Sequence, residues 1–290
     1  IRKVETMSKN DRSIYTCIDD YGLGLVHNEI IRKIVETGVI SGVTTFVGMK
    51  NFQNEATALK ALLNKTNFQI GLHLDFIEFF PFMKESRYLS SDTFCTIFLI
   101  FQSLGLLNKK SITESIVKQL DIFQKSFGQL PDFIDGHYHL HQTKVPCDIL
   151  IHILEEKEFA GWVRSTSMHS ELNNLSIVNK IKKRYLSLIG MKAQEKILKN
   201  FRTNLSFVGY TDLNSNNEYV KQLNNQLEFV TGPTLFMLHP GSSKDDSQIN
   251  SHDSQARDLE TEWILNELQN KCKELNLNII KDFDNLWIKT

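Results

Sequence analysis

The chain has 290 residues and a formal net charge of −1, with 41% hydrophobic and 23% charged residues. This composition supports a substantial core and excludes a disordered chain. The near-neutral charge gives no electrostatic argument for a nucleic-acid or anionic-membrane partner. The four cysteines, Cys17, Cys95, Cys147 and Cys272, are scattered without a CxxC pair. They predict reduced thiols in a cytoplasmic protein.

Taken in order, the chain alternates β-rich runs with amphipathic segments. The predicted strands are 13–18, 42–47, 68–75, 130–134, 160–164, 205–208, 234–238 and 277–280. The predicted helices are 27–37, 54–63, 113–127, 146–157, 174–202, 218–229 and 254–275. Strands separated by helices favour an α/β fold with a parallel sheet. A TIM-barrel-like (β/α) barrel of seven or eight strands is the economical architecture.

No linker divides the sequence, so we expect one domain over residues 1–290, with 1–12 as a poorly structured extension. The first seven residues lack the apolar core of a signal peptide. The longest apolar run, 94–107, is too short and too polar to span a membrane. It predicts a buried helix or a lid.

The alternation of strands and helices breaks after the third strand, where an aromatic-rich insertion begins. Its aromatic residues are Phe76, Phe79, Phe80, Phe82, Tyr88 and Phe94. Beside a site they could form a wall that stacks on sugar rings, and they could equally pack the core. On the first interpretation, 76–88 would cover the mouth of the site and Phe79 would contact substrate.

A run of metal-binding residue types follows the fourth strand: Asp135, His137, His139 and His141. On an extended backbone every second side chain points to the same side. These four could therefore face one pocket together, or fan across it where the strand ends. A lone histidine is readily explained by core packing. A cluster of groups that are costly to bury unpaired favours a metal site.

Polar residues also end other predicted strands. Asp19 and Asp20 end the first strand, His73 the third and His239 the seventh. All lie at carboxyl ends, the face where barrel enzymes place their chemistry. One carboxylate and two imidazoles make an open divalent site. A further carboxylate can accept the proton of water, and an opposing histidine can protonate a leaving group.

The paired aspartates are ambiguous in isolation, because Asp-Asp often caps a helix or forms a turn. On a strand, adjacent side chains point to opposite sides. Where the strand ends, both could still reach the pocket, so that one binds metal while the other acts as a base.

Four motifs together resemble the YdjC-like (ChbG-type) carbohydrate deacetylases. They are Asp19-Asp20-Tyr21-Gly22-Leu23 with His27-Asn28, Gly71-Leu72-His73-Leu74, Asp135-x-His137-x-His139-x-His141, and Met237-Leu238-His239-Pro240-Gly241. The resemblance implies a TIM-barrel-like fold and one divalent metal ion, Mg²⁺ or Zn²⁺. It also implies hydrolysis of an N-acetyl group from an amino sugar, as in chitooligosaccharide deacetylation. Met49 and Leu235 stand where members of the family often have Asn and Glu.

Carried over by motif, the resemblance implies that Asp20, His73 and His137 bind metal. Asp19 would be the base and His239 the acid, with His139 and His141 as supporting or substrate contacts. We add Arg164 and Phe79 as candidate substrate contacts. The expected partner is a small carbohydrate, without nucleic acid or membrane, and a homodimer is left open.

Two other functions compete with this interpretation. Another metal-dependent hydrolase, such as a phosphoesterase, would also use clustered histidines. It would need more basic or glycine-rich phosphate contacts near the site than we find in the sequence. The second alternative is a catalytically inactive sugar-binding relative. The complete set of predicted ligands, base and acid argues against it.

Overall fold

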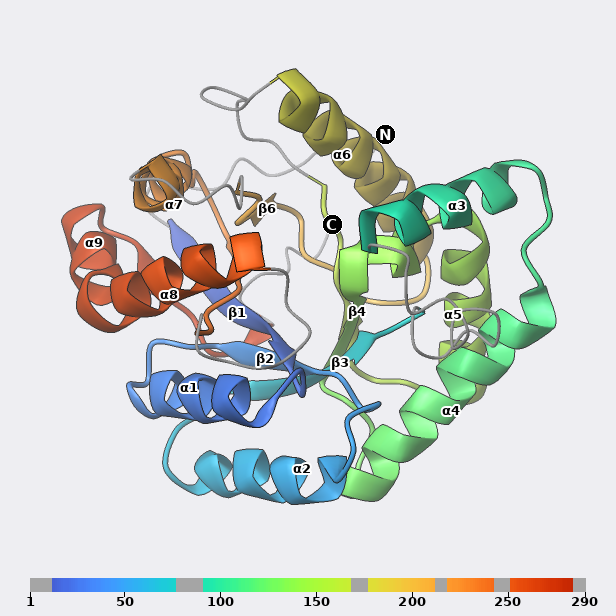
Figure 1. Cartoon of the computed structure of the whole chain (residues 1–290), viewed down its shortest axis with the longest axis horizontal. Helices are drawn as coiled ribbons and strands as arrows, with labels where there is room; N and C mark the ends of the chain where they lie inside the picture. Colours follow the sequence, from blue (N-terminus) through green and yellow to red (C-terminus); the bar gives the residue numbers. More distant parts are fainter. Residues whose placement is uncertain (1–11, 77–90, 168–176, 212–217, 243–250, 284–290) are drawn as a thin grey trace.

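A parallel sheet wrapped by helices forms the centre of the molecule (Figure 1). The structure, a computed structural model, describes residues 12–76, 91–167, 177–211, 218–242 and 251–283. The strands are β1 (Ser13–Tyr21), β2 (Gly42–Thr45), β3 (Gln69–Leu74), β4 (Phe133–Gly136), β5 (Trp162–Val163), β6 (Phe207–Val208), β7 (Thr234–Leu238) and β8 (Asn278–Ile279). The α-helices are α1 (Leu25–Glu36), α2 (Phe52–Ala61), α3 (Ser91–Ser103), α4 (Lys109–Phe127), α5 (Lys144–Glu156), α6 (Ile177–Ile197), α7 (Glu218–Glu228), α8 (Ser251–Asn266) and α9 (Leu268–Glu274). Two short 3₁₀ segments are η1 (Leu62–Asn64) and η2 (His137–Gln142).

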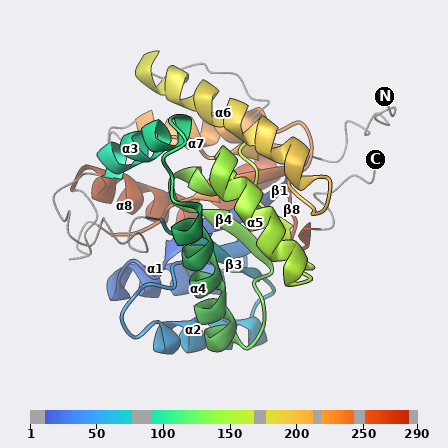
Figure 2. The ribbon, with the colours of Figure 1, turned by 90° about the vertical axis from the view of Figure 1, so that its right-hand side faces the viewer.

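The sheet runs in the order β5-β4-β3-β2-β1-β7-β6, and β8 pairs with the start of β1 off this path. All of its strand pairs are parallel. Within the described residues, β5 and β6 share no ladder, although Trp162 forms a single parallel bridge with Arg202, just before β6. Figure 2 shows the helices on the outside and the strands within. The architecture is a parallel α/β half-barrel of seven strands plus β8, consistent with the predicted seven or eight strands.

Alternate residues of the strands point inward, and at the amino-terminal end of the half-barrel many of them are aromatic. Trp162 stacks between Phe133 and Phe283, with ring centroids 4.3 and 4.0 Å apart. Tyr15 meets Trp162 edge-on at 5.5 Å. Glycine is needed beside these rings, because a Cβ at Gly71 would lie 2.6 Å from the Phe133 ring. This aromatic plug (Tyr15, Cys17, Phe133, Trp162, Phe207, Leu235, Met237, Phe283) fills the interior below the carboxyl ends of the strands.

The predicted order of strands and helices is confirmed, with ends that differ by a few residues. Two segments differ more. The predicted helix 254–275 is two helices, α8 and α9, because Glu267 leaves helical geometry with a φ of −121°. An extended backbone through 135–141, one of the two arrangements considered for this segment, is not formed, because β4 ends at Gly136 and η2 begins at His137.

The aromatic-rich insertion is described only in part. Phe79 and the other residues of 77–90 lie outside the described residues. Of the neighbouring aromatic residues, Phe76, Phe94 and Phe98 are buried in the core. Phe98 packs against the other two at 5.9 and 5.8 Å. For Phe76 and Phe94, core packing is the correct one of the two interpretations.

Three smaller expectations can be compared with the structure. Cys17, Cys147 and Cys272 are free, buried thiols. None of the described helices is long and apolar enough to cross a membrane. The expected N-terminal extension lies outside the described residues except for Arg12. Its guanidinium donates to the carbonyl oxygens of Val230 and Leu275 at 2.7 and 2.8 Å, so this residue is anchored.

Candidate active site

A layer of polar and charged side chains lies directly above the aromatic plug. On most strands each member of this layer follows a plug residue by two positions, as Asp135 follows Phe133. On β3 the layer residue follows Gly71, the glycine that makes room for the Phe133 ring. The layer consists of Asp19, His73, Asp135, Arg164 and His239. All except His239 are almost completely buried. The period-two pattern of each strand thus changes from apolar to polar at the carboxyl end.

Asp20 joins this layer although it neighbours Asp19 in sequence. The pairing of β1 with β2 shifts register between Ile18 and Tyr21, and Asp20 has a φ of 71°. Such a bulge re-aims the side chain. A non-glycine residue in this region costs about 1–3 kcal/mol, a strain found most often at functional sites. The bulge explains how adjacent aspartates both reach the pocket, which the sequence left open.

Asp20, His73 and His137 form a group whose ligand atoms could hold a metal ion. Oδ1 of Asp20 lies 3.4 Å from Nε2 of His73 and 3.6 Å from Nδ1 of His137. Bonds of about 2.1 Å in tetrahedral geometry place donor atoms about 3.4 Å apart. The observed spacings therefore fit an ion of the size of zinc.

The charged side chains around Asp20 also favour the binding of a cation. Oδ1 of Asp20 is buried and accepts no hydrogen bond from the described part of the chain, which is costly for a carboxylate. The buried carboxylates of Asp19, Asp20 and Asp135 are paired with the guanidinium groups of Arg164 and Arg257. In the metal-free protein a proton on His73 supplies the third positive charge beside these three carboxylates, and a metal ion that displaces this proton would supply positive charge in its place.

His73 is oriented by contacts on its far side. Its Nδ1 lies 2.7 Å from Oδ1 of Asp135, and a proton held there leaves Nε2 directed at Asp20. Phe46 packs edge-on against both candidate imidazole ligands, 4.7 Å from His73 and 5.1 Å from His137. Burial lowers the pKa of His73, but nearby carboxylates, Asp135 foremost, outweigh it and raise the pKa to about 9. At neutral pH a metal ion must therefore displace a proton from this ring.

Asp19, His73 and Asp135 form a second group of possible ligands. Its two carboxylates already face a positive charge, the guanidinium of Arg164. Arg164 donates through Nη1 and Nη2 to the two oxygens of Asp19, both at 2.6 Å. Its Nη1 also lies 2.8 Å from Asp135. Because this guanidinium already neutralises the carboxylates, the Asp20 group is the better metal site. Arg164 has no exposed surface, so we assign it to these carboxylates in place of the substrate.

The same guanidinium sets the charge of Asp19. Burial raises the pKa of this carboxyl, but the charge and hydrogen bonds of Arg164 outweigh burial and hold the pKa below its usual range. Asp19 is therefore ionised at neutral pH, as a proton acceptor must be.

His239 approaches Asp19 from the end of β7. Its Nε2 lies 3.9 Å from Oδ2 of Asp19, and 23% of its side chain is exposed. Burial lowers the pKa of His239 to about 4. The ring is therefore neutral at neutral pH in the metal-free protein, and it can act as an acid only after it takes up a proton.

The histidines after Asp135 fan out, the second of the two arrangements that the sequence allows. The backbone leaves the extended form after Gly136, and Tyr138 and His139 take left-handed φ values of 51° and 57°. The turn brings His137 to the metal group. It also leaves Tyr138 40% exposed, with its ring edge-on to His137 at 4.3 Å.

His139 and His141 have contacts that support the site. His141 is buried, with Nε2 3.0 Å from the carbonyl oxygen of Arg164. His139 packs edge-on against Phe207 of the plug, with ring centroids 5.7 Å apart. These contacts fit a supporting role better than a substrate contact. Phe79, the remaining candidate, lies outside the described residues.

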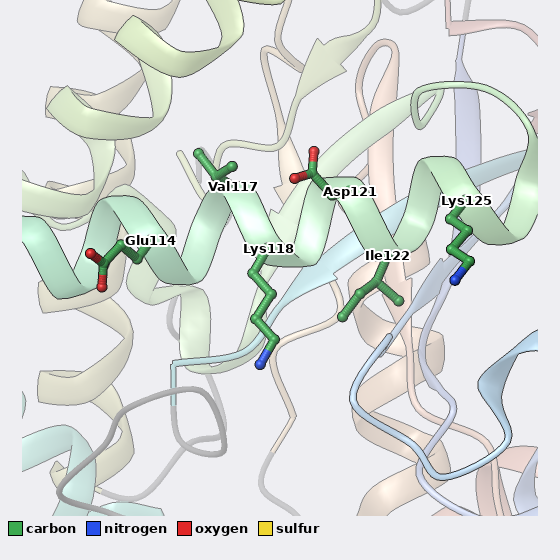
Figure 3. A pocket seen from close by; sticks show the side chains of 6 residues that line it. All are labelled: Glu114, Val117, Lys118, Asp121, Ile122 and Lys125. Atoms are coloured by element: carbon green, nitrogen blue, oxygen red, sulfur yellow. The ribbon is translucent and has the colours of Figure 1, made fainter.

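A separate pocket lies on the solvent-facing side of α4 (Figure 3). Side chains of this one helix line it: Glu114, Val117, Lys118, Asp121, Ile122 and Lys125. None of them belongs to the candidate metal group or to the polar layer. We therefore place the chemistry at the carboxyl ends of the strands.

Comparison with known proteins decides the family. A family model described as YdjC-like protein matches residues 13–277, which include strands β1 to β7 and every candidate site residue that the structure describes. The chain belongs to the YdjC-like family.

Relatives of this YdjC-like chain include a carbohydrate deacetylase of Xenopus laevis. The two are 26% identical over 145 residues, which make up 48% of this chain and 46% of that protein. The match therefore spans about half the length of this relative.

Among solved structures, a protein of Enterococcus faecalis described as a cellobiose-phosphate cleavage protein has a TM-score of 0.65 at 17% identity. The match covers 96% of this chain and 100% of that chain, and it shows a shared fold. A polysaccharide deacetylase of Bacillus cereus is more distant, with a TM-score of 0.40, 10% identity and 96% of each chain covered.

Two residues of this YdjC-like site were missed in the sequence, and both lie on α8. Nη2 of Arg257 donates to Oδ2 of Asp20 at 2.6 Å. Glu260 accepts the backbone N–H of His239 at 2.9 Å and the hydroxyl of Tyr219. Charged residues three apart on a helix are typical of an exposed face. These two are 7% and 1% exposed, which only the packing of α8 reveals.

Proposed function

We propose that this YdjC-like chain is a metal-dependent carbohydrate deacetylase. It would remove the N-acetyl group from an amino sugar or a chitooligosaccharide-like substrate. The observation that carries the proposal is that a group able to hold a metal ion, a separate carboxylate and a separate imidazole lie together at the carboxyl ends of the strands. The similarity of half the chain to a carbohydrate deacetylase supports the same chemistry. We take the half-barrel to be a TIM-barrel-like fold, whose active sites lie at this face.

Asp20, His73 and His137 would hold one divalent ion. Bound there, the ion would polarise the amide carbonyl and lower the pKa of water. Two imidazoles and one carboxylate suit zinc better than magnesium, which prefers oxygen ligands. Zn²⁺ is therefore our first choice and Mg²⁺ the second.

Asp19 is the proposed base and His239 the proposed acid. An oxygen of Asp19 lies within 4.8 Å of a ring nitrogen of His73, so water at the metal group is within its reach. An amine is a poor leaving group unless it is protonated. Nε2 of His239 lies 3.9 Å from Oδ2 of Asp19. His239 can therefore take up the proton that Asp19 removes from water and deliver it to the departing nitrogen.

The decisive experiment is incubation with a panel of N-acetylated sugars and oligomers, with added Zn²⁺ or Mg²⁺, scored for released acetate. Metal-dependent acetate release from at least one sugar is expected. A phosphate monoester in the same panel tests the phosphoesterase alternative. Binding of a sugar without turnover would instead identify an inactive relative.

His239→Ala should lower kcat by roughly 10²–10⁴-fold, because positioned proton transfer is typically worth that much. The metal content should stay near that of the wild type, since His239 lies outside the ligand group. Turnover and metal content are measured on the same preparations. His152→Ala, which removes an exposed histidine of α5, is the matched control. Full turnover by His239→Ala would refute its role as the acid.

Tyr138→Ala should raise KM while kcat stays close to that of the wild type. The exposed ring lies beside His137, where an aromatic face can stack on a sugar ring. Tyr138→Phe, which keeps the ring, should retain the wild-type KM. Phe229→Ala is the control, because this residue is exposed to a similar degree and lies before the start of β7, away from the site. An unchanged KM for Tyr138→Ala would exclude a substrate contact.

A further inference from the structure

Arg257 lies behind the candidate ligand Asp20, from which 237 residues separate it in the sequence. Its Nη2 donates to Oδ2 of Asp20 at 2.6 Å, and the two side chains are only 8% and 2% exposed. The other oxygen, Oδ1, faces His73 and His137. The two oxygens of this carboxylate therefore have different partners.

This division matters because Asp20 sits in a bulge with a left-handed backbone. A carboxylate can bind a metal through one oxygen or through both, and it can rotate between these states. With Oδ2 engaged by a charge-assisted hydrogen bond, only Oδ1 is directed toward the two imidazoles. Arg257 thus fixes the direction in which Asp20 presents its free oxygen.

Arg257 is itself held in place, because α8 is fastened to the loop after β7. Gly241 donates its N–H to Oγ1 of Thr261 at 2.9 Å, and this hydroxyl donates back to the Gly241 carbonyl at 2.9 Å. Glu260 accepts the N–H of His239. A Cβ at Gly241 would lie 2.8 Å from Nδ1 of His27 and 3.1 Å from Cδ of Arg257, so glycine leaves room for both side chains.

We propose that Arg257 is a positioning residue that keeps Asp20 a single-oxygen metal ligand. It thereby sets the affinity and the coordination geometry of the metal site. The proposal rests on the proposed function, because it assumes that Asp20, His73 and His137 bind the ion. It adds a residue of α8 that none of the four sequence motifs contains.

The test is metal binding by metal-stripped wild type, Arg257→Gln, Arg257→Lys and Glu262→Gln. Zn²⁺ affinity is measured by competition with a chelating dye, and the visible spectrum of bound Co²⁺ reports coordination. Arg257→Gln should weaken Zn²⁺ binding about 10–100-fold, as is typical when a residue that orients a ligand is lost. Its Co²⁺ spectrum should also change, because Asp20 is free to turn.

Arg257→Lys keeps the charge and should recover part of the affinity. Glu262→Gln alters an exposed residue of the same helix and should match the wild type. A change in fold stability alone would lower the melting temperature of both Arg257 variants without altering the Co²⁺ spectrum. If Arg257→Gln fails to fold, Arg257→Lys decides by the same readouts.

Wild-type Zn²⁺ affinity and an unchanged Co²⁺ spectrum in a folded Arg257 variant would overturn the proposal and leave the proposed function intact. A wild type that binds no metal would overturn the proposed function and this inference with it. A wild type that binds metal but releases no acetate from any sugar would overturn only the deacetylase activity.

Discussion

Asp19→Asn should lower kcat by roughly 10²–10⁴-fold while the protein still binds one metal ion. The amide keeps the size of the side chain but cannot accept the proton of water. Asp19 lies outside the ligand group, and its oxygens are taken up by Arg164, so the metal site keeps its donors. Turnover of the sugar substrate and metal content are measured on the same preparation.

The variant also removes one charge that faces the buried guanidinium of Arg164. Breaking one side of a buried ion pair destabilises proteins, so the melting temperature should fall, and kinetics must be recorded well below it. Asp121→Asn, at an exposed aspartate of α4, is the matched control. If Asp19→Asn purified without metal, Asp19 would be a ligand and the assignment of the two aspartates would have to be reversed.

His73→Ala should lose both bound metal and activity. The ring supplies Nε2 to the ligand group, and Asp135 holds its other nitrogen at 2.7 Å. With the ring gone, Asp20 and His137 would remain, and two donors do not make the three-ligand set of an open zinc site. Elemental analysis after dialysis measures the metal, and acetate release measures the activity.

The two variants separate the roles within one pocket. Asp19→Asn is expected to keep metal and lose turnover, whereas His73→Ala is expected to lose both. His152→Ala again serves as the control for histidine removal. One equivalent of metal retained by His73→Ala would show that the ion is bound elsewhere, even if the protein is a deacetylase.

Much of the fold follows from local pattern in the sequence. In strands such as 234–238 and helices such as 113–127, the spacing of hydrophobic residues that predicts the element involves only residues close together in the sequence. The alternation that places Asp19 and Asp135 inward is a property of the strand backbone itself. The candidate metal ligands could therefore be predicted without knowing how the strands pair, because each lies at or just beyond the carboxyl end of a predicted strand.

The sequence could not decide what each side chain contacts. The sequence offered Arg164 only as a candidate substrate contact, whereas in the structure its buried guanidinium pairs with Asp19 and Asp135. The aromatic residues of the insertion could form a wall or pack the core, and the two of them that the structure describes, Phe76 and Phe94, pack in the core. The contacts of a side chain depend on which distant segments of the chain pack together, and the local sequence pattern does not contain this information.

The sequence by itself determined the order of elements, the carboxyl-end position of the site and the residue types for metal and proton chemistry. Only the tertiary structure decided that a bulge brings both adjacent aspartates close to His73, and that the chain turns sharply after Gly136. It alone also placed Arg257 against Asp20 across 237 residues. The physical reason is that periodicity is set by neighbouring peptide units, whereas the partner of a buried charge is set by which surfaces pack together.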